Sequence, residues 1–179
     1  RYSCQLFWLS GYFQSSSINF GSFALTLNAA KDIFIVKYDS FGNGVWAKSA
    51  GGADDDFASS ICTDGNGNVF LTGAYTNSTI IFGNDTLPFA ANYDVFVAKY
   101  NSIGNVLWAK SGVGNGSDYG YGTTADLNGN VFITGAFFSP TIIFGGDTLV
   151  NLFPSGVTTD IFVVKFIQSY YFREGFIKI

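Results

Sequence analysis

The chain has 179 residues, of which 47% are hydrophobic, 18% are aromatic and only 12% are charged. This composition is too apolar for a disordered chain, and the length allows one domain with a sizeable core. The formal net charge of −4 argues against a nucleic-acid partner, because binding to a phosphate backbone requires a basic surface.

The most informative pattern is a repeat, in which Gly11, Gly73 and Gly135 open three matching segments 62 residues apart. The heptapeptide that begins at Asp32 returns at Asp94 with the same spacing. Its third copy begins at Asp160, which is 66 residues after the second because four additional residues precede it. A period of this size indicates an array of supersecondary units, each of which buries its faces against its neighbours.

We expect residues 1–179 to form a single repeat array, with approximate units at 1–57, 58–119 and 120–179. The first and last units are incomplete or degenerate, because 1–10 lacks the Asp-Gly-x-Gly-Asn turn and 166–179 lacks the Trp-Ala-Lys segment. The sequence has no initial Met and no visible signal peptide, so we expect a piece of a longer chain or a processed product. No apolar run approaches the roughly 18 residues of a membrane-spanning helix, so we expect no membrane span.

Taken in chain order, the second unit predicts four strands and a small hairpin. The expected strands are Ala58–Thr63, Val69–Tyr75, Val95–Tyr100 and Val106–Lys110, with the hairpin at Thr79–Leu87. Glycine and asparagine, which adopt positive φ at low cost, fill the tight turn at 64–68. Ser111–Gly116 is expected to cross to the next unit.

The third strand of the unit indicates how the units are arranged. Val95, Phe96, Val97 and Ala98 are apolar on both faces of the strand, whereas a sheet with one wet face alternates apolar and polar residues. A β-sandwich would predict that alternation, and a flat solenoid would need shorter repeats. The sequence therefore favours an all-β fold of β-propeller-like blades, each with four antiparallel strands and covered on both faces by neighbours.

These segments resemble a known repeat. Asp-Val-Phe-Val-Ala-Lys-Tyr at 94–100, Gly-Asn-Val-Leu-Trp-Ala-Lys at 104–110 and the Asp-Gly-x-Gly-Asn turn with its strand at 64–73 are similar to the bacterial seven-bladed β-propeller repeat family (SBBP repeat). The resemblance covers roughly residues 11–166. It implies a secreted or surface-exposed bacterial protein, usually large and multi-modular, and it implies no common catalytic residues.

Closed propellers need about four to eight blades, and this chain holds about three partial or complete ones. We therefore expect a ring that is not closed, with apolar blade faces exposed at both ends of the array. The expected partners are the remaining blades of a larger chain or other copies of the same chain.

The sequence contains few residues that could catalyse a reaction or bind a metal. The chain has no His, which removes the commonest general base, and Cys4 and Cys62 are not at equivalent positions of the repeat. We favour two buried or free thiols over a disulfide, and we assign no catalytic, cofactor-binding or metal-binding residues.

Two loops resemble calcium loops, with oxygen ligands at alternate positions. Their residues are Asp64, Asn66 and Asn68 in the second unit and Asp126, Asn128 and Asn130 in the third. Both lack the glycine that should follow and the distal Glu, so we favour an Asx-type turn and keep Ca²⁺ as the alternative.

Two further groups have a structural and a functional interpretation. Asp54, Asp55 and Asp56 form the densest charge cluster, and Asp56 matches Asp118 one period later. These carboxylates either cap turns in a solvated loop, which we favour, or bind a cation or act as an acid/base pair on a polysaccharide. Trp46, Trp108, Tyr38 and Tyr100 recur inside apolar strands, where core packing is favoured over sugar stacking.

The sequence favours a non-catalytic structural or interaction module of an extracellular bacterial propeller, which presents loops to a glycan or protein ligand. A hydrolase or lyase acting through loop carboxylates, and a surface protein that self-assembles through open blade faces, are the alternatives. The expected recognition surface combines the hairpin regions and the crossings, at Thr76–Tyr93, Phe138–Thr159, Gly51–Phe57 and Gly112–Tyr119.

Overall fold

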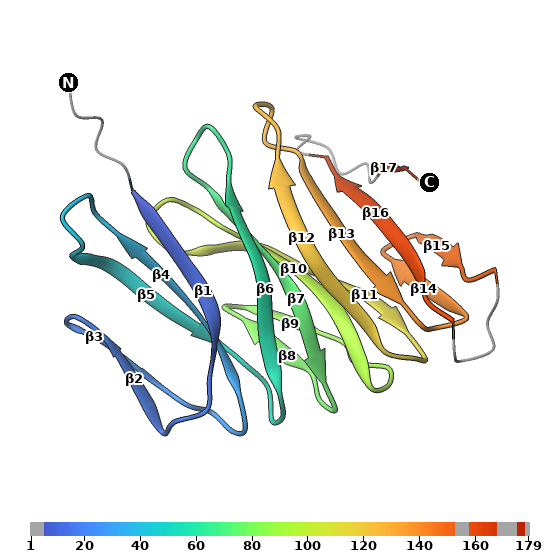
Figure 1. Cartoon of the computed structure of the whole chain (residues 1–179), viewed down its shortest axis with the longest axis horizontal. Helices are drawn as coiled ribbons and strands as arrows, with labels where there is room; N and C mark the ends of the chain where they lie inside the picture. Colours follow the sequence, from blue (N-terminus) through green and yellow to red (C-terminus); the bar gives the residue numbers. More distant parts are fainter. Residues whose placement is uncertain (1–5, 153–157, 168–174, 178–179) are drawn as a thin grey trace.

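The computed structural model describes residues 6–152, 158–167 and 175–177, and the regular structure of these residues consists of antiparallel strands (Figure 1). The first unit holds β1 (Phe7–Phe13), β2 (Ser17–Phe20), β3 (Phe23–Thr26), β4 (Asp32–Tyr38) and β5 (Gly44–Ala50). The second holds β6 (Asp56–Thr63), β7 (Val69–Thr76), β8 (Ile80–Phe82), β9 (Asp85–Leu87), β10 (Tyr93–Tyr100) and β11 (Val106–Gly114). The third holds β12 (Asp118–Ala125), β13 (Val131–Phe137), β14 (Thr141–Phe144), β15 (Asp147–Val150), β16 (Asp160–Phe166) and β17 (Gly175–Ile177).

Each unit forms a sheet of the same design. In the second unit β6, β7, β10 and β11 lie side by side in chain order, and in the third β12, β13, β16 and β17 do the same. The first unit has the order β1, β4, β5 within the described residues. The three sheets follow one another across the molecule without closing into a ring (Figure 1), which confirms the expected all-β, open array of blades. Within the described ranges, no helix is long and apolar enough to cross a membrane.

The predicted strands agree with the structure except at the end of the second unit. The segment expected to cross from Ser111 begins as strand, because β11 continues to Gly114. The extension is paired with β14 of the third unit, with Gly112 opposite Phe144 and Gly114 opposite Ile142. The crossing is therefore shorter than predicted, since the backbone groups at this end of β11 find partners on the next unit's hairpin.

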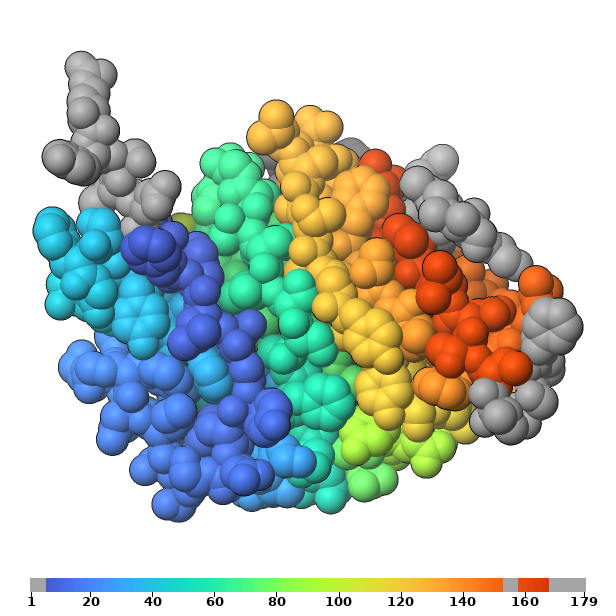
Figure 2. Space-filling model, in the orientation of Figure 1, coloured from blue at the N-terminus to red at the C-terminus, as the bar shows by residue number. Residues whose placement is uncertain are grey.

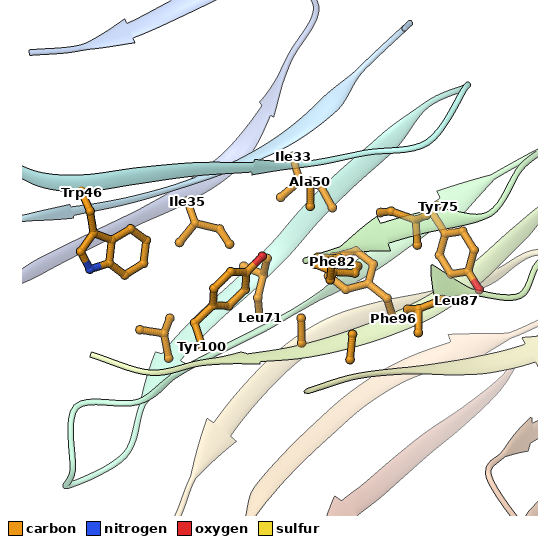
Figure 3. Packing of buried hydrophobic residues seen from close by; sticks show 14 residues of the cluster. Ile33, Ile35, Trp46, Ala50, Leu71, Tyr75, Phe82, Leu87, Phe96 and Tyr100 are labelled. Atoms are coloured by element: carbon orange, nitrogen blue, oxygen red, sulfur yellow. The ribbon is translucent and has the colours of Figure 1, made fainter. Parts of the chain in front are cut away.

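The first hydrophobic core lies between the first and second units. Ile33, Ile35 and Trp46 of the first unit lie opposite Leu71 and Tyr100 of the second (Figure 3). Rings contribute to the contact, because Trp46 stacks on Tyr100 with a centroid separation of 6.5 Å.

The second core lies between the second and third units, and strand β10 contributes to both. Val95 and Val97 face the second core, whereas Phe96 and Ala98 face the first, and all four side chains are fully buried. The prediction that both faces of this strand are covered is therefore confirmed. Burial on both sides explains why apolar residues run continuously here rather than alternating with polar ones.

The hairpins fill the spaces between units. Ile80, Phe82 and Leu87 of the β8–β9 hairpin are buried in the first core, and the β14–β15 hairpin occupies the same place in the second core. Each hairpin also pairs with the end of the preceding unit. Ile81 bridges to Gly51, the residue after β5, and β14 pairs with β11. The inward-facing apolar side chains of these hairpins complete the cores, so only the outward-facing side, which carries the exposed Ile81 and Ile143, is left for the expected recognition surface.

Candidate functional site

The outer face of the third unit is the first candidate surface. Ile161, on β16, is 71% exposed, although its counterpart in the second unit, Val95, is fully buried. Phe132 and Val163 lie on the same face and are half-buried. Their counterparts Phe70 and Val97 are fully buried against the third unit, so the exposed face has the residues of a blade interface.

The outer face of the first unit is the opposite half of such an interface. Phe7 and Leu9 of β1 are exposed, whereas their counterparts Val69 and Leu71 are fully buried against the first unit. The β2–β3 hairpin covers part of this face, where Leu25 is buried with other apolar residues of the unit. The two ends of the array therefore present unlike and complementary apolar faces.

The second candidate surface lies where the crossings meet the starts of the first and third strands. Phe57, Tyr93, Tyr119 and Tyr121 form a continuous group of rings, which we call the rim cluster. The Tyr93 and Tyr119 centroids are 5.2 Å apart, Phe57 and Tyr119 stack at 6.5 Å, and Tyr119 and Tyr121 stack at 6.1 Å with an interplanar angle of 6°. Two of these rings, Tyr119 and Tyr121, belong to β12. Figure 2 shows the face on which β12 lies beside β6, with β1 next to β6.

A groove of about 570 Å³ adjoins the rim cluster. Tyr119 and Tyr121 form one part of its lining, and the rest comes from the crossing and from neighbouring loops. The polar side chains in the lining, apart from the two tyrosines, are Asn92, Asn115 and Ser117. None of the lining residues carries a charge, so the groove offers aromatic faces and neutral hydrogen-bonding groups.

Buried carboxylates hold the crossings in place. Asp118, which is fully buried, accepts hydrogen bonds from the Phe138 and Ser139 amides and from the Ser139 hydroxyl at 3.1, 3.2 and 2.7 Å. Its counterpart Asp56 accepts from the Gly52 amide at 2.5 Å. The match between Asp56 and Asp118 noted in the sequence therefore reflects equivalent places, the first residues of β6 and β12, where each carboxylate is bonded to backbone donors.

The third strands begin with equivalent buried carboxylates. Asp94 accepts from the Ala90 and Gly114 amides at 2.7 and 3.0 Å, and Asp32 accepts from the Asn28 amide at 2.7 Å. Burial raises the pKa of Asp56 to about 7 and that of Asp94 to about 6. The pKa of Asp32 and that of Asp118 are also raised by burial.

After burial, the neighbouring charges of Asp54 and Asp55 in the acidic cluster also raise the pKa of Asp56. Asp55 forms an ion pair with Lys31, and both side chains are about a third exposed. Among the residues that the structure describes, no group of three or more metal-ligating side chains is assembled.

The two calcium-like loops have the geometry of the turn that the sequence favoured. One oxygen of Asp64 accepts from the Asn66 and Asn68 amides at 2.9 Å, and the other accepts from the Asn68 side chain at 2.7 Å. Asp126 makes the same three contacts in the third unit. The Asx-type turn is confirmed, because N–H donors of the same loop engage both oxygens of each carboxylate.

The recurring aromatic residues are also structural. Trp46 and Tyr100 are buried in the first core, Trp108 packs against the second, and Tyr38 packs against the apolar cluster of the first unit. Core packing, the favoured interpretation, is confirmed. Cys62 is a free thiol whose pKa is raised by burial, and Cys4 lies outside the described residues.

The rim cluster was not identified as a group in the sequence. One signal was available, since Phe57 and Tyr119 occupy equivalent positions 62 residues apart. Tyr93 gave no such signal, because its counterparts in the other units are Lys31 and Thr159. Only the packing of neighbouring units brings these rings together.

Comparison with models of known protein families finds no match. The chain is 28% identical over 156 residues to an uncharacterized WD repeat-containing protein, L264, of Acanthamoeba polyphaga mimivirus. This match covers 79% of the chain but only 11% of the viral protein, so the chain spans about a tenth of that protein's length. A WD repeat forms a four-stranded propeller blade, and the similarity therefore supports a β-propeller repeat, as the sheets indicate.

Proposed function

We propose that the chain is a non-catalytic interaction module, a run of blades within a larger β-propeller whose end faces pack against further blades. The observation that carries this proposal is the pair of open end faces. Ile161 and Leu9 are exposed, yet their repeat counterparts, Val95 and Leu71, are fully buried between units. Exposed apolar faces of this kind mark protein interaction surfaces.

The partners in this proposal are the remaining blades of a longer polypeptide or, where these are lacking, other copies of the chain. Because the two end faces are unlike, copies would join head to tail rather than face to face. The resemblance to SBBP repeats supports an extracellular or cell-surface location in a bacterium.

The burial of Asp56 and Asp118 supports a non-catalytic role over the hydrolase or lyase alternative. Both carboxylates are engaged with backbone amides, and a general acid or base must reach its substrate.

Light scattering on the purified chain, coupled to size exclusion, tests the proposal. The expected result is concentration-dependent association, or binding of an apolar dye such as ANS where the end faces remain uncovered. A chain that stays monomeric at high concentration and binds no dye would contradict the proposal. A discrete oligomer would identify other copies as sufficient partners.

A further inference from the structure

The rim cluster and its groove are not explained by blade packing. At the junction of the first and second units, the positions equivalent to Tyr93 and Ser117 hold Lys31 and Asp55, which form an ion pair. The position equivalent to Tyr121 holds Ser59. The position equivalent to Tyr119 holds Phe57, so one ring recurs between the two junctions. The same blade geometry is built without the other two, so the fold does not require Tyr93 or Tyr121.

The rings are also accessible. Tyr121 is 56% exposed, while Phe57, Tyr93 and Tyr119 are half-buried, so the cluster presents ring surface to solvent. Its centroid separations of 5.2 to 6.5 Å keep the rings in contact, which fixes their orientation before any ligand arrives. A preorganised aromatic surface binds with less loss of side-chain entropy than mobile rings would.

The groove beside the cluster selects the class of ligand. Its lining has no Lys or Arg, which a phosphate or carboxylate ligand would need, and no acidic side chain, which a cationic ligand would need. Instead it offers the amide groups of Asn92 and Asn115 and the hydroxyl of Ser117 beside Tyr119 and Tyr121. A neutral molecule with a flat apolar face and many hydroxyl groups matches this lining.

We infer that the groove bounded by Tyr119, Tyr121, Asn92 and Asn115 binds a segment of a neutral glycan, with sugar rings stacked on the tyrosines. Sugars pair an apolar C–H face with a rim of hydroxyls, so stacking and amide hydrogen bonds act together. The volume of about 570 Å³ lies within the range of about 300–1,000 Å³ that ligand pockets occupy. This inference rests on the proposed role as an interaction module and adds the class of ligand.

The test uses the full chain on a glycan array with neutral, acidic and amino sugars, followed by calorimetric titration with the best soluble neutral oligosaccharide. We expect binding to neutral glycans alone. Tyr121→Ala should weaken the affinity by about tenfold, because one stacking contact is lost, whereas Tyr121→Phe should stay within about twofold. Phe41→Ala is the matched control, since Phe41 is an exposed ring in the turn between β4 and β5, away from the cluster.

Circular dichroism and melting temperature establish that each variant is folded, and the exposure of Tyr121 means that its truncation removes little core contact. The inference is overturned if no neutral glycan binds, if only charged glycans or peptides bind, or if the Tyr119→Ala/Tyr121→Ala double variant binds as the wild type does. A chain that assembles through its end faces but ignores neutral glycans would overturn the inference and leave the proposed function intact.

Discussion

At the residue scale, the recurring lysines show how the repeat places charge within apolar sheets. The ammonium groups of Lys37, Lys99 and Lys165 lie over the rings of Trp8, Phe70 and Phe132 at 4.9, 4.9 and 5.1 Å from the ring centroids. These rings are themselves one period apart. Each unit therefore contains the same cation–π pair, and the lysines serve the sheets rather than a basic binding surface.

The raised pKa values of the buried carboxylates predict how the free energy of unfolding depends on pH. Burial raises the pKa of Asp56 from 3.8 to about 7. Between about pH 4 and pH 7, the folded chain therefore still holds a proton that the unfolded chain has already released. The free energy of unfolding should therefore fall as pH rises through this window, by up to about 1.4 kcal/mol per pH unit for such a group. Urea unfolding at pH 5 and pH 7.5 measures the difference.

The Asp56→Asn variant should make this dependence shallower, because an amide has no proton to release, while Asp94, whose pKa is raised to about 6, keeps part of the slope. Asp39→Asn is the matched control: Asp39 is half-buried beside the turn between β4 and β5, and the hydrogen bond from the Asn43 side chain lowers its pKa, so it titrates below the window. A wild-type chain that gains stability between pH 5 and pH 7.5 would contradict the assignment.

At the element scale, the glycines that revealed the repeat have a steric reason. A Cβ at Gly73 would lie 2.0 Å from the carbonyl oxygen of Phe57, and one at Gly135 would lie 2.0 Å from that of Tyr119. In both units the first strand has a bulge opposite this glycine, at Ala58/Ser60 in β6 and at Gly120/Gly122 in β12. The glycine thus lets the bulged strand approach its neighbour.

Gly73→Ala should lower the free energy of unfolding by about 1–3 kcal/mol, because β6 must shift to admit the methyl group. Denaturant unfolding provides the measurement. Gly65→Ala is the control, since a Cβ there meets nothing within 4 Å and Gly65 has no positive φ. Equal stability of the two variants would show that β6 moves at no cost.

The hairpins yield a second prediction at this scale. Phe144 of β14 is 1% exposed and contacts Phe162 and Phe166, with centroid separations of 5.2 and 6.4 Å. Phe144→Ala should therefore cost about 3–5 kcal/mol in unfolding free energy, as for other buried rings. Phe41→Ala, which removes an 86% exposed ring, should cost almost nothing, and a similar loss in both variants would refute the role of the hairpin in the core.

The sequence predicted the strands well and the placement of surfaces less well, for a physical reason. Strand β10 could be recognised because apolar residues on both faces are a local signal. The β8–β9 hairpin is also local, but its burial between two sheets depends on how neighbouring units pack. The rim cluster combines Tyr93 with Tyr119, and no spacing in the chain indicates that these residues meet.

At the scale of the whole molecule, the end faces govern behaviour in solution. We expect Ile161→Asp with Val163→Asp to reduce association and dye binding while leaving the fold intact, because both side chains lie on the open face of the third unit. Light scattering and circular dichroism measure these two properties. Leu127→Asp, in an exposed turn, is the control and should associate as the wild type does. If the double variant associates as strongly as the wild type, the open face of the third unit is not the surface through which copies associate.

The hairpins of the second and third units contact the preceding unit in the chain, and this order bears on how the protein folds during translation. The β14–β15 hairpin of the third unit pairs with β11 of the second, and Ile81 of the second unit bridges to Gly51 of the first. The first and second units thus each receive strand pairing from residues that are translated after them. We therefore expect each blade to reach full stability on the ribosome only when the hairpin of its successor has emerged, so that folding proceeds from the N-terminus one unit behind translation.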